Sequence, residues 1–464
     1  MKFKSICCFI IFGVSIFKVS FAQIDSSVLS LNEFIDNIRL FHPLAKKADL
    51  KINFAAAELL SARGNLDPTL GASWNEKNFD KKLYYRQYQA KLKIPTILGL
   101  DVVGGYENTE GYFVNPEKKT DEFGLWHVGL ELNILQGLVF NERKIALQQA
   151  KVFQQMSENE RNAAINDLLY DATSSYLKWQ QYYYYQEVLN ENIVIANDYY
   201  NNTRISFLSG EKTSMDTLEA FIMYQDALNI LQTNKLSLVE TMQQVENYLW
   251  FKDFPISMQE NTKPEDYNNI ANTSGLDISV ASAVKNNPLV LAYSNKLAYF
   301  EIEQKLKRQK VLPKLKLKYN QLLATSDNNV LPNYAMTNYK WGFDFYMPLL
   351  LRSERANIQK GQIKLQEITL DIENKSNELQ NKIQASISKL AVLRGQQVLI
   401  EQKVAGYKLL LDGENEKFNY GESSVFLLTK RQEKYINERL KLIEYKIKIR
   451  KVLLNYLFYS NQLI

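Results

Sequence analysis

The sequence predicts an α+β fold that combines two long antiparallel helical hairpins with two-faced β-strands. Apolar residues recur at helical spacing over very long stretches, polar and apolar residues alternate strictly elsewhere, and the whole arrangement occurs twice. Helical spacing places apolar side chains along one side of a rod, and alternation places them on one face of a strand. We therefore expect an elongated, duplicated molecule of rods and strands.

The clearest helical pattern lies near the C-terminus and begins at residue 352. It contains no proline, and apolar residues recur in steps of three, four or seven at Ile368, Ile372, Leu379, Ile383, Ile387, Leu390 and Leu393. A turn follows at Gly421, after which the pattern resumes from Ile436 to Leu457. At 1.5 Å per residue, an outgoing arm of roughly 65 residues would be about 100 Å long. The sequence therefore predicts a long helical hairpin over 352–459.

The chain contains an internal duplication. The phrase that ends in His42-Pro43-Leu44 returns as Asn287-Pro288-Leu289, at an offset of 245 residues. Because a proline suits the first turn of a helix, the residue before it is expected to cap that helix. Since His42 corresponds to Asn287 in the second copy of the phrase, a capping role is favoured over a metal or catalytic role for the histidine.

The duplication divides the chain into two structural repeats joined by a linker. We expect the first repeat at 23–250, with strands over 69–134 and a helical hairpin over 141–249. The linker follows at 251–275, where proline, asparagine and aspartate gather. The second repeat is expected at 276–464, with strands over 314–347 before its hairpin.

The strands have one apolar and one polar face. The polar side chains of interest are Lys314, Lys316, Lys318, Asp344 and Glu131, and they alternate with apolar residues that include Leu317, Phe343 and Leu132. One interpretation is a pair of hairpins packed on a soluble core. The other is a membrane β-barrel, in which the apolar set faces lipid and the charged set faces a wet lumen.

The first repeat carries an additional segment between its strands. Its tip glycine, Gly210, precedes Gly421 by 211 residues rather than 245, so about 34 extra residues lie within 81–121. Two short runs there, 88–94 and 100–106, have the alternation of an extra hairpin. The sequence leaves open whether this hairpin joins a barrel.

The N-terminal 22 residues are predicted to be a signal peptide. Lys2 and Lys4 precede an apolar run that is too short to span a bilayer, and small residues precede a cleavage site after Ala22. An uncleaved anchor is the alternative. The net charge of +5 becomes +2 without the three lysines of this segment, which gives no case for nucleic acid. Nothing in the sequence indicates catalytic residues, a cofactor site or a metal site, so we expect no enzyme.

One motif occurs at the tip of both hairpins. It reads Phe-x-x-Gly-x-x-Ser/Thr, and its residues are Phe207, Gly210 and Thr213 in the first repeat and Phe418, Gly421 and Ser424 in the second. With the duplicated order of helix, strands and long hairpin, it resembles the TolC family of outer-membrane efflux proteins over nearly the whole chain. The resemblance implies a homotrimer with one shared transmembrane β-barrel in outer-membrane lipid and an α-helical tunnel that extends into the periplasm.

The resemblance also implies partners and a function. The hairpin tips would dock on a periplasmic adaptor (membrane fusion) protein, which couples the channel to an inner-membrane transporter. The chain would then be the passive exit duct of a multi-component efflux or type I secretion system. Family members often carry acidic residues six and nine positions after the second tip glycine, where this chain has Leu427 and Lys430. The first repeat has Asp216 and Glu219 at those offsets, so these three charged residues are candidates for the tunnel entrance.

The alternative from a different class is a periplasmic coiled-coil adaptor or spacer protein without a channel. Its strands would then form a soluble β domain, and its long helices would serve only for association with other proteins. The two readings differ in where the apolar strand faces go, which the alternation by itself does not decide.

Overall fold

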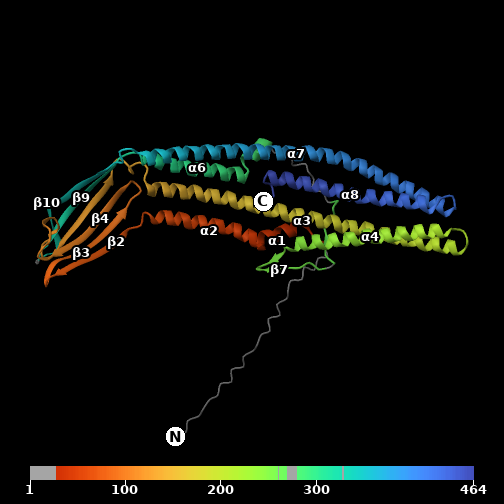
Figure 1. The fold of residues 1–464 in the computed structure, drawn as a ribbon, viewed down its shortest axis with the longest axis horizontal. Helices are drawn as coiled ribbons and strands as arrows, with labels where there is room; N and C mark the ends of the chain where they lie inside the picture. Colours follow the sequence, from red (N-terminus) through yellow and green to blue (C-terminus); the bar gives the residue numbers. More distant parts are fainter. Residues whose placement is uncertain (1–27, 260, 269–278, 327–328, 464) are drawn as a thin grey trace, which may run out of the picture.

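The computed structural model describes residues 28–259, 261–268, 279–326 and 329–463. The predicted signal peptide and residues 269–275 of the predicted linker lie outside the described residues. The molecule is elongated, with a β-sheet at one end and the tips of two helical hairpins at the other (Figure 1). Within the described residues, no helix is both long and apolar enough to cross a membrane.

The elements of the first half follow the predicted order. They are β1 (Val28–Leu29), α1 (Leu31–Phe41), α2 (Pro43–Gly64), β2 (Thr69–Phe79), β3 (Lys82–Pro95), β4 (Leu100–Glu110), the short 3₁₀ helix η1 (Pro116–Lys118), β5 (Leu125–Asn133), α3 (Glu142–Leu208) and α4 (Ser214–Glu246). The connecting segment contains β6 (Trp250–Phe251), β7 (Phe254–Pro255) and β8 (Lys263–Pro264). The second half contains α5 (Val280–Lys285), α6 (Pro288–Gln309), β9 (Lys314–Ser326), β10 (Asn329–Tyr346), α7 (Arg352–Asn419) and α8 (Val425–Tyr459).

The long helices confirm the predicted rods. Helix α3 has 67 residues and α7 has 68, so each is about 100 Å long at 1.5 Å per residue. Figure 1 shows that α2 and α4 run along successive lengths of α3, while α6 and α8 do the same along α7. The body therefore consists of four rods side by side, two continuous and two made of shorter helices end to end.

Equivalent caps begin the second helix of each half. The side chain of His42 accepts a hydrogen bond from the backbone N–H of Leu44 at 3.2 Å, and Asn287 accepts one from Leu289 at 3.0 Å. Burial lowers the pKa of His42, in agreement with a neutral ring whose nitrogen accepts this hydrogen bond. The capping role predicted for this histidine is confirmed.

A hydrophobic core lies midway along the rods, where α1 and α3 meet the connecting segment. Phe34, Tyr176 and Trp179 are fully enclosed there. The hydroxyl of Tyr176 donates to the carbonyl of Leu29 at 2.7 Å and accepts from the backbone N–H of Glu265 at 3.0 Å. These bonds fix β1 and the connecting segment to the long helix.

All six long strands form one antiparallel sheet in the order β10-β9-β5-β4-β3-β2. The extra hairpin of the first half is part of this sheet, because β3 pairs with β2 and β4 pairs with β5. In the single chain, the extra hairpin is therefore an integral part of the sheet. The two halves meet where β5 pairs with β9, and strands β2 and β10 form the edges.

Candidate functional site

The sheet has two chemically different faces. The apolar face carries Leu70, Trp74, Tyr88, Leu92, Val102, Tyr106, Trp126, Val128, Leu130, Leu132, Leu317, Tyr319, Trp341, Phe343 and Phe345, which the strand register brings together. The other, charged face carries lysines and carboxylates. The predicted grouping of Leu132, Leu317 and Phe343 is confirmed, since these three residues are direct neighbours across β5, β9 and β10.

Exposure on the central strand β5 is the reverse of that in a soluble protein. The side chains of the apolar face are open, with Trp126 46% exposed, Val128 54% and Leu130 47%. On the charged face, His127 is only 8% exposed and Glu131 only 7%. A soluble sheet buries its apolar face and exposes its charged face to water. In this sheet the apolar face is exposed and the charged side chains of β5 are buried.

An aromatic row crosses the apolar face towards the loop ends of the strands. Trp74, Tyr88, Tyr106 and Trp126 contact one another in turn, with ring centroids 6.2, 6.0 and 5.0 Å apart. Beyond this row, the guanidinium of Arg86 pairs with both Glu76 and Glu110. In outer-membrane barrels, aromatic girdles mark the lipid interface and charges lie beyond it. The spacing from Tyr88 to Ile94 spans six residues, or roughly 20 Å along the strand, against an apolar band of about 25 Å in such barrels.

The charged face holds two buried carboxylates, each shared by two cations. Glu131 accepts from Lys91 at 3.0 Å and from Lys316 at 2.6 Å. On the neighbouring strand, Asp101 binds Lys93 at 2.9 Å and Arg143, from the first turn of α3, at 2.5 Å. Pairing of this kind is what keeps a carboxylate charged when water is largely excluded. These ion pairs tie β3, β4, β5 and β9 together and join the sheet to a long helix.

The predicted lumen residues all lie on this charged face. Lys316 contacts Glu131, Lys318 forms an ion pair with Asp344, and Lys314 lies over the ring of Tyr346 at 5.9 Å. The prediction missed Asp101 and Arg143. Asp101 lies in the alternating run at 100–106, so the sequence held a signal for its face of the strand. Its ion pair with Arg143 joins that strand to a helix start 42 residues away, which no local pattern reveals.

At the other end of the molecule, both hairpins reverse at the predicted glycines. Gly210 has φ 81° and Gly421 has φ 78°, a left-handed conformation that disfavours other residues. The N–H of each glycine donates to the carbonyl of the phenylalanine three residues earlier, Phe207 or Phe418, at 3.0 Å. A Cβ at either glycine would meet no atom within 4 Å. The backbone conformation at both positions therefore favours glycine, and the space above the two glycines is open in the single chain.

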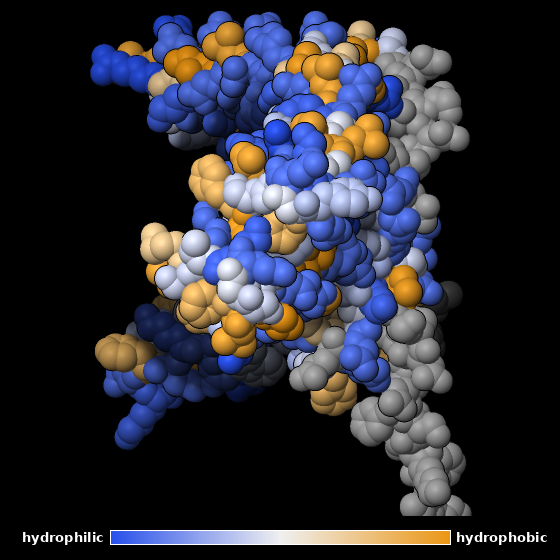
Figure 2. All heavy atoms as spheres, turned by 90° about the vertical axis from the view of Figure 1, so that its right-hand side faces the viewer, coloured by the Kyte–Doolittle hydropathy of each residue, from blue (hydrophilic) through white to orange (hydrophobic). Residues whose placement is uncertain are grey.

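The two tips lie side by side and expose apolar side chains. The ammonium of Lys212 in the first tip is 4.8 Å from the ring centre of Phe418 in the second. Leu208, Met215 and Tyr420 are each more than 70% exposed. Figure 2 views this end of the molecule and shows apolar residues scattered among hydrophilic ones.

The tip residues with side-chain hydroxyls begin the return helices. Thr213 caps α4 and Ser424 caps α8. The carboxylate of Asp216 accepts bonds from the N–H and the hydroxyl of Thr213, at 2.9 and 2.7 Å, and these bonds lower its pKa. Asp216 thus belongs to a capping box, a Thr-x-x-Asp pattern that the sequence already displayed.

The other predicted entrance residues are Glu219 on α4 and Lys430 on α8. Lys430 is exposed and pairs with Glu433 at 2.9 Å, and this bond, together with the charge of Glu219, raises its pKa.

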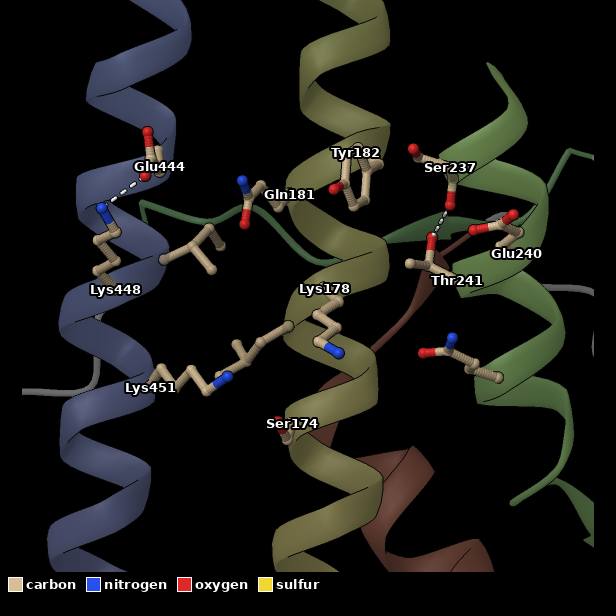
Figure 3. A pocket seen from close by; sticks show the side chains of 13 residues that line it. Ser174, Lys178, Gln181, Tyr182, Ser237, Glu240, Thr241, Glu444, Lys448 and Lys451 are labelled. Atoms are coloured by element: carbon tan, nitrogen blue, oxygen red, sulfur yellow. Dashed lines mark hydrogen bonds and ion pairs between the residues drawn. The ribbon is translucent and has the colours of Figure 1, made fainter. Parts of the chain in front are cut away.

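A surface groove of about 400 Å³ lies midway along the rods, between α4 and α8 and over α3. Figure 3 shows Lys178, Glu240 and Lys451 along it, together with Glu444, which pairs with Lys448. The hydroxyl of Thr241 donates to the carbonyl of Ser237 at 2.8 Å. Several polar groups that line the groove are thus already bonded to other protein groups, and the groove is open to solvent. Among the described residues, no cluster of histidine, cysteine and carboxylate side chains could hold a metal ion.

Comparison with known proteins identifies the fold. No protein-family model and no curated protein sequence matches the chain. Solved structures do match it, among them the Campylobacter jejuni outer membrane channel CmeC, with a TM-score of 0.68, 14% identity and coverage of 93% of this chain and 85% of that one.

Two further structures give the same result. The Neisseria gonorrhoeae outer membrane channel MtrE matches with a TM-score of 0.67 and 13% identity, covering 93% of this chain and 88% of its own. The Vibrio cholerae outer membrane protein VceC matches with a TM-score of 0.65 and 12% identity, covering 93% and 96%. The chain therefore has the fold of the outer-membrane channels of the TolC family.

Proposed function

We propose that this protein is an outer-membrane channel, the passive exit duct of a multi-component efflux or type I secretion system. It would act as a homotrimer, anchored in outer-membrane lipid and extending into the periplasm. Residues 1–22 would direct its export and be removed, which the mass of the mature N-terminal peptide would test.

The observation that carries this proposal is the reversed exposure of the sheet, in which the apolar face is open and the carboxylate of Glu131 is buried. Leaving Trp126, Val128 and Leu130 in water while burying Glu131 would be unfavourable, because each apolar side chain of this size loses roughly 1.5 to 3 kcal/mol when it is not buried. In a bilayer the same arrangement is favourable, since lipid covers the apolar face and a wet lumen takes the charged face. Glu131, Asp344 and the lysines at 314, 316 and 318 would then line the lumen.

Closure of the barrel requires other copies. A lipid-facing sheet cannot leave unpaired N–H and C=O groups at its edges, and here β2 and β10 are edges in the single chain. Three copies would close eighteen strands by pairing β2 of one with β10 of the next. Barrels of about 16 to 18 strands leave an aqueous channel. The same three copies would surround a tunnel with twelve long helix arms.

The hairpin tips would dock on a periplasmic adaptor, which couples the duct to an inner-membrane transporter. Their exposed apolar side chains and the open space above Gly210 and Gly421 support this role. We expect Gly421→Trp to retain trimer formation and bilayer conductance but to abolish efflux in cells. Loss of the trimer would make the glycine structural, and efflux that persists with Trp at both glycines would exclude the tips as the docking site. Asp216, Glu219 and Lys430 would stand at the entrance beside them.

The alternative, a periplasmic coiled-coil adaptor or spacer, is separated by fractionation. A channel stays with the outer membrane after a high-salt wash and gives discrete conductance steps when purified protein is added to a planar bilayer. A spacer washes free and does not conduct. Release of the protein by salt, or silent bilayers from intact trimers, would refute the channel.

A further inference from the structure

The charged face of the sheet has an excess of positive charge. In the described sheet up to the register shift after Lys77, the register places seven lysines on this face, Lys77, Lys91, Lys93, Lys314, Lys316, Lys318 and Lys340. Lys82 lies beyond that shift, at the loop end of β3, and is not counted. The same face has four carboxylates, Asp101, Glu107, Glu131 and Asp344. The excess of three positive charges per chain becomes nine in a trimer, before Arg143 at the helix start is counted.

The carboxylates do not cancel this excess where they lie. Glu131 and Asp101 are buried, and each is held by two cations, so either cluster keeps a positive balance. Lys77, Lys314 and Lys340 are exposed. Lys314 on β9 and Lys340 on β10 lie near opposite ends of the uninterrupted register that runs from Lys314 to Gln321 and from Tyr339 to Tyr346.

The opposite, apolar face carries fewer charged side chains and has no excess of positive charge. Its charges in the same part of the sheet are Arg86, Glu76 and Glu110, and Arg86 binds both carboxylates at one edge of the apolar band. The excess of positive charge is therefore confined to the side that a barrel would enclose. A passage lined by one sign of charge between low-dielectric walls focuses the field and concentrates ions of the opposite sign. Rings of lysine and arginine are the lining that favours anions in membrane pores.

We propose that the barrel lumen of this protein is selective for anions, so that the duct favours anionic solutes. This inference rests on the proposed channel function and adds the class of solute that the barrel admits. Because the charges act through water, the preference should weaken as salt rises and the Debye length falls from about 10 Å at 0.1 M to about 3 Å at 1 M.

The test is the reversal potential of purified trimers in planar bilayers under a KCl gradient. Wild-type channels should pass chloride in preference to potassium, more strongly at low salt. The double variant Lys314→Glu/Lys340→Glu changes the net charge of the face from three positive to one negative per chain. It should therefore reverse the preference to potassium. Both lysines lack an ion pair to the buried carboxylates, so the variant spares those pairs.

Two controls separate charge from other effects. Lys314→Arg/Lys340→Arg keeps the charge and should keep the anion preference. Lys47→Glu makes one of the same lysine-to-glutamate changes on exposed α2, 17 residues or about 26 Å from the end of that helix, and should leave selectivity unchanged. Trimers that conduct but prefer potassium, or an anion preference that survives the double Glu variant, would overturn the inference. Intact trimers that do not conduct at all would instead refute the channel function.

Discussion

The membrane orientation of the sheet predicts opposite outcomes for one arginine placed on either face of β3. Leu92 lies on the apolar face between Leu70 and Gly104 and is 40% exposed in the single chain. Gln89, three residues away on the same strand, lies on the charged face beside Glu107. We expect Leu92→Arg to prevent assembly and Gln89→Arg to be tolerated.

The magnitude follows from the depth of Leu92 in the apolar band. An arginine on the lipid face near the bilayer midplane costs about 2 to 4 kcal/mol, which is roughly a 30-fold to 1,000-fold shift in equilibrium for one chain. Three copies in a trimer raise the cost to about 6 to 12 kcal/mol, comparable with the whole stability of a typical domain. On the lumen face the same side chain stays in water next to a carboxylate and costs little.

The assay is the amount of heat-modifiable trimer in outer-membrane fractions, with total protein measured in parallel. Gln89 is a better control position than Lys316, because Lys316 binds buried Glu131 and its removal would leave that carboxylate with one partner. Equal trimer levels for Leu92→Arg and Gln89→Arg would refute the assignment of the apolar face to lipid.

Three further predictions concern packing, the core and pH. A methyl group at Gly129 would lie 2.1 Å from a backbone oxygen of β9, so Gly129→Ala should cost about 1 to 3 kcal/mol in urea unfolding from liposomes, whereas Gly71→Ala, with no atom within 4 Å, should not. Tyr176→Phe removes the partner of the buried Leu29 carbonyl and of the half-buried Glu265 N–H and should destabilise the trimer by about 1 to 3 kcal/mol, measured by thermal melting. The bonds from Thr213 hold the pKa of Asp216 below its ordinary value, so the first turn of α4 should lose protection from hydrogen exchange as pH falls through that lowered pKa, and Asp216→Asn should lack this transition.

Much of the architecture is determined by local sequence patterns. Helical spacing over dozens of residues gives the rods of α3 and α7, and strict alternation gives the two faces of β5 and β9, because both depend only on backbone geometry. The tip glycines are likewise local, since a reversal after Phe207 or Phe418 needs a left-handed residue at a fixed position. The capping box of Asp216 belongs to the same class, although the Thr-x-x-Asp spacing went unused in the prediction.

Other features were decided only by the tertiary structure. The alternation of 88–94 and 100–106 fits a separate hairpin and an integral one equally well, because strand pairing is a contact between distant segments. Only the fold shows that β3 and β4 complete a six-stranded sheet. It is also the fold that places Glu131 between Lys91, 40 residues before it, and Lys316, from the other repeat. The sequence determined that this chain has a charged face, and the pairing of its strands decided how that charge is balanced, since ion pairs across a sheet depend on register.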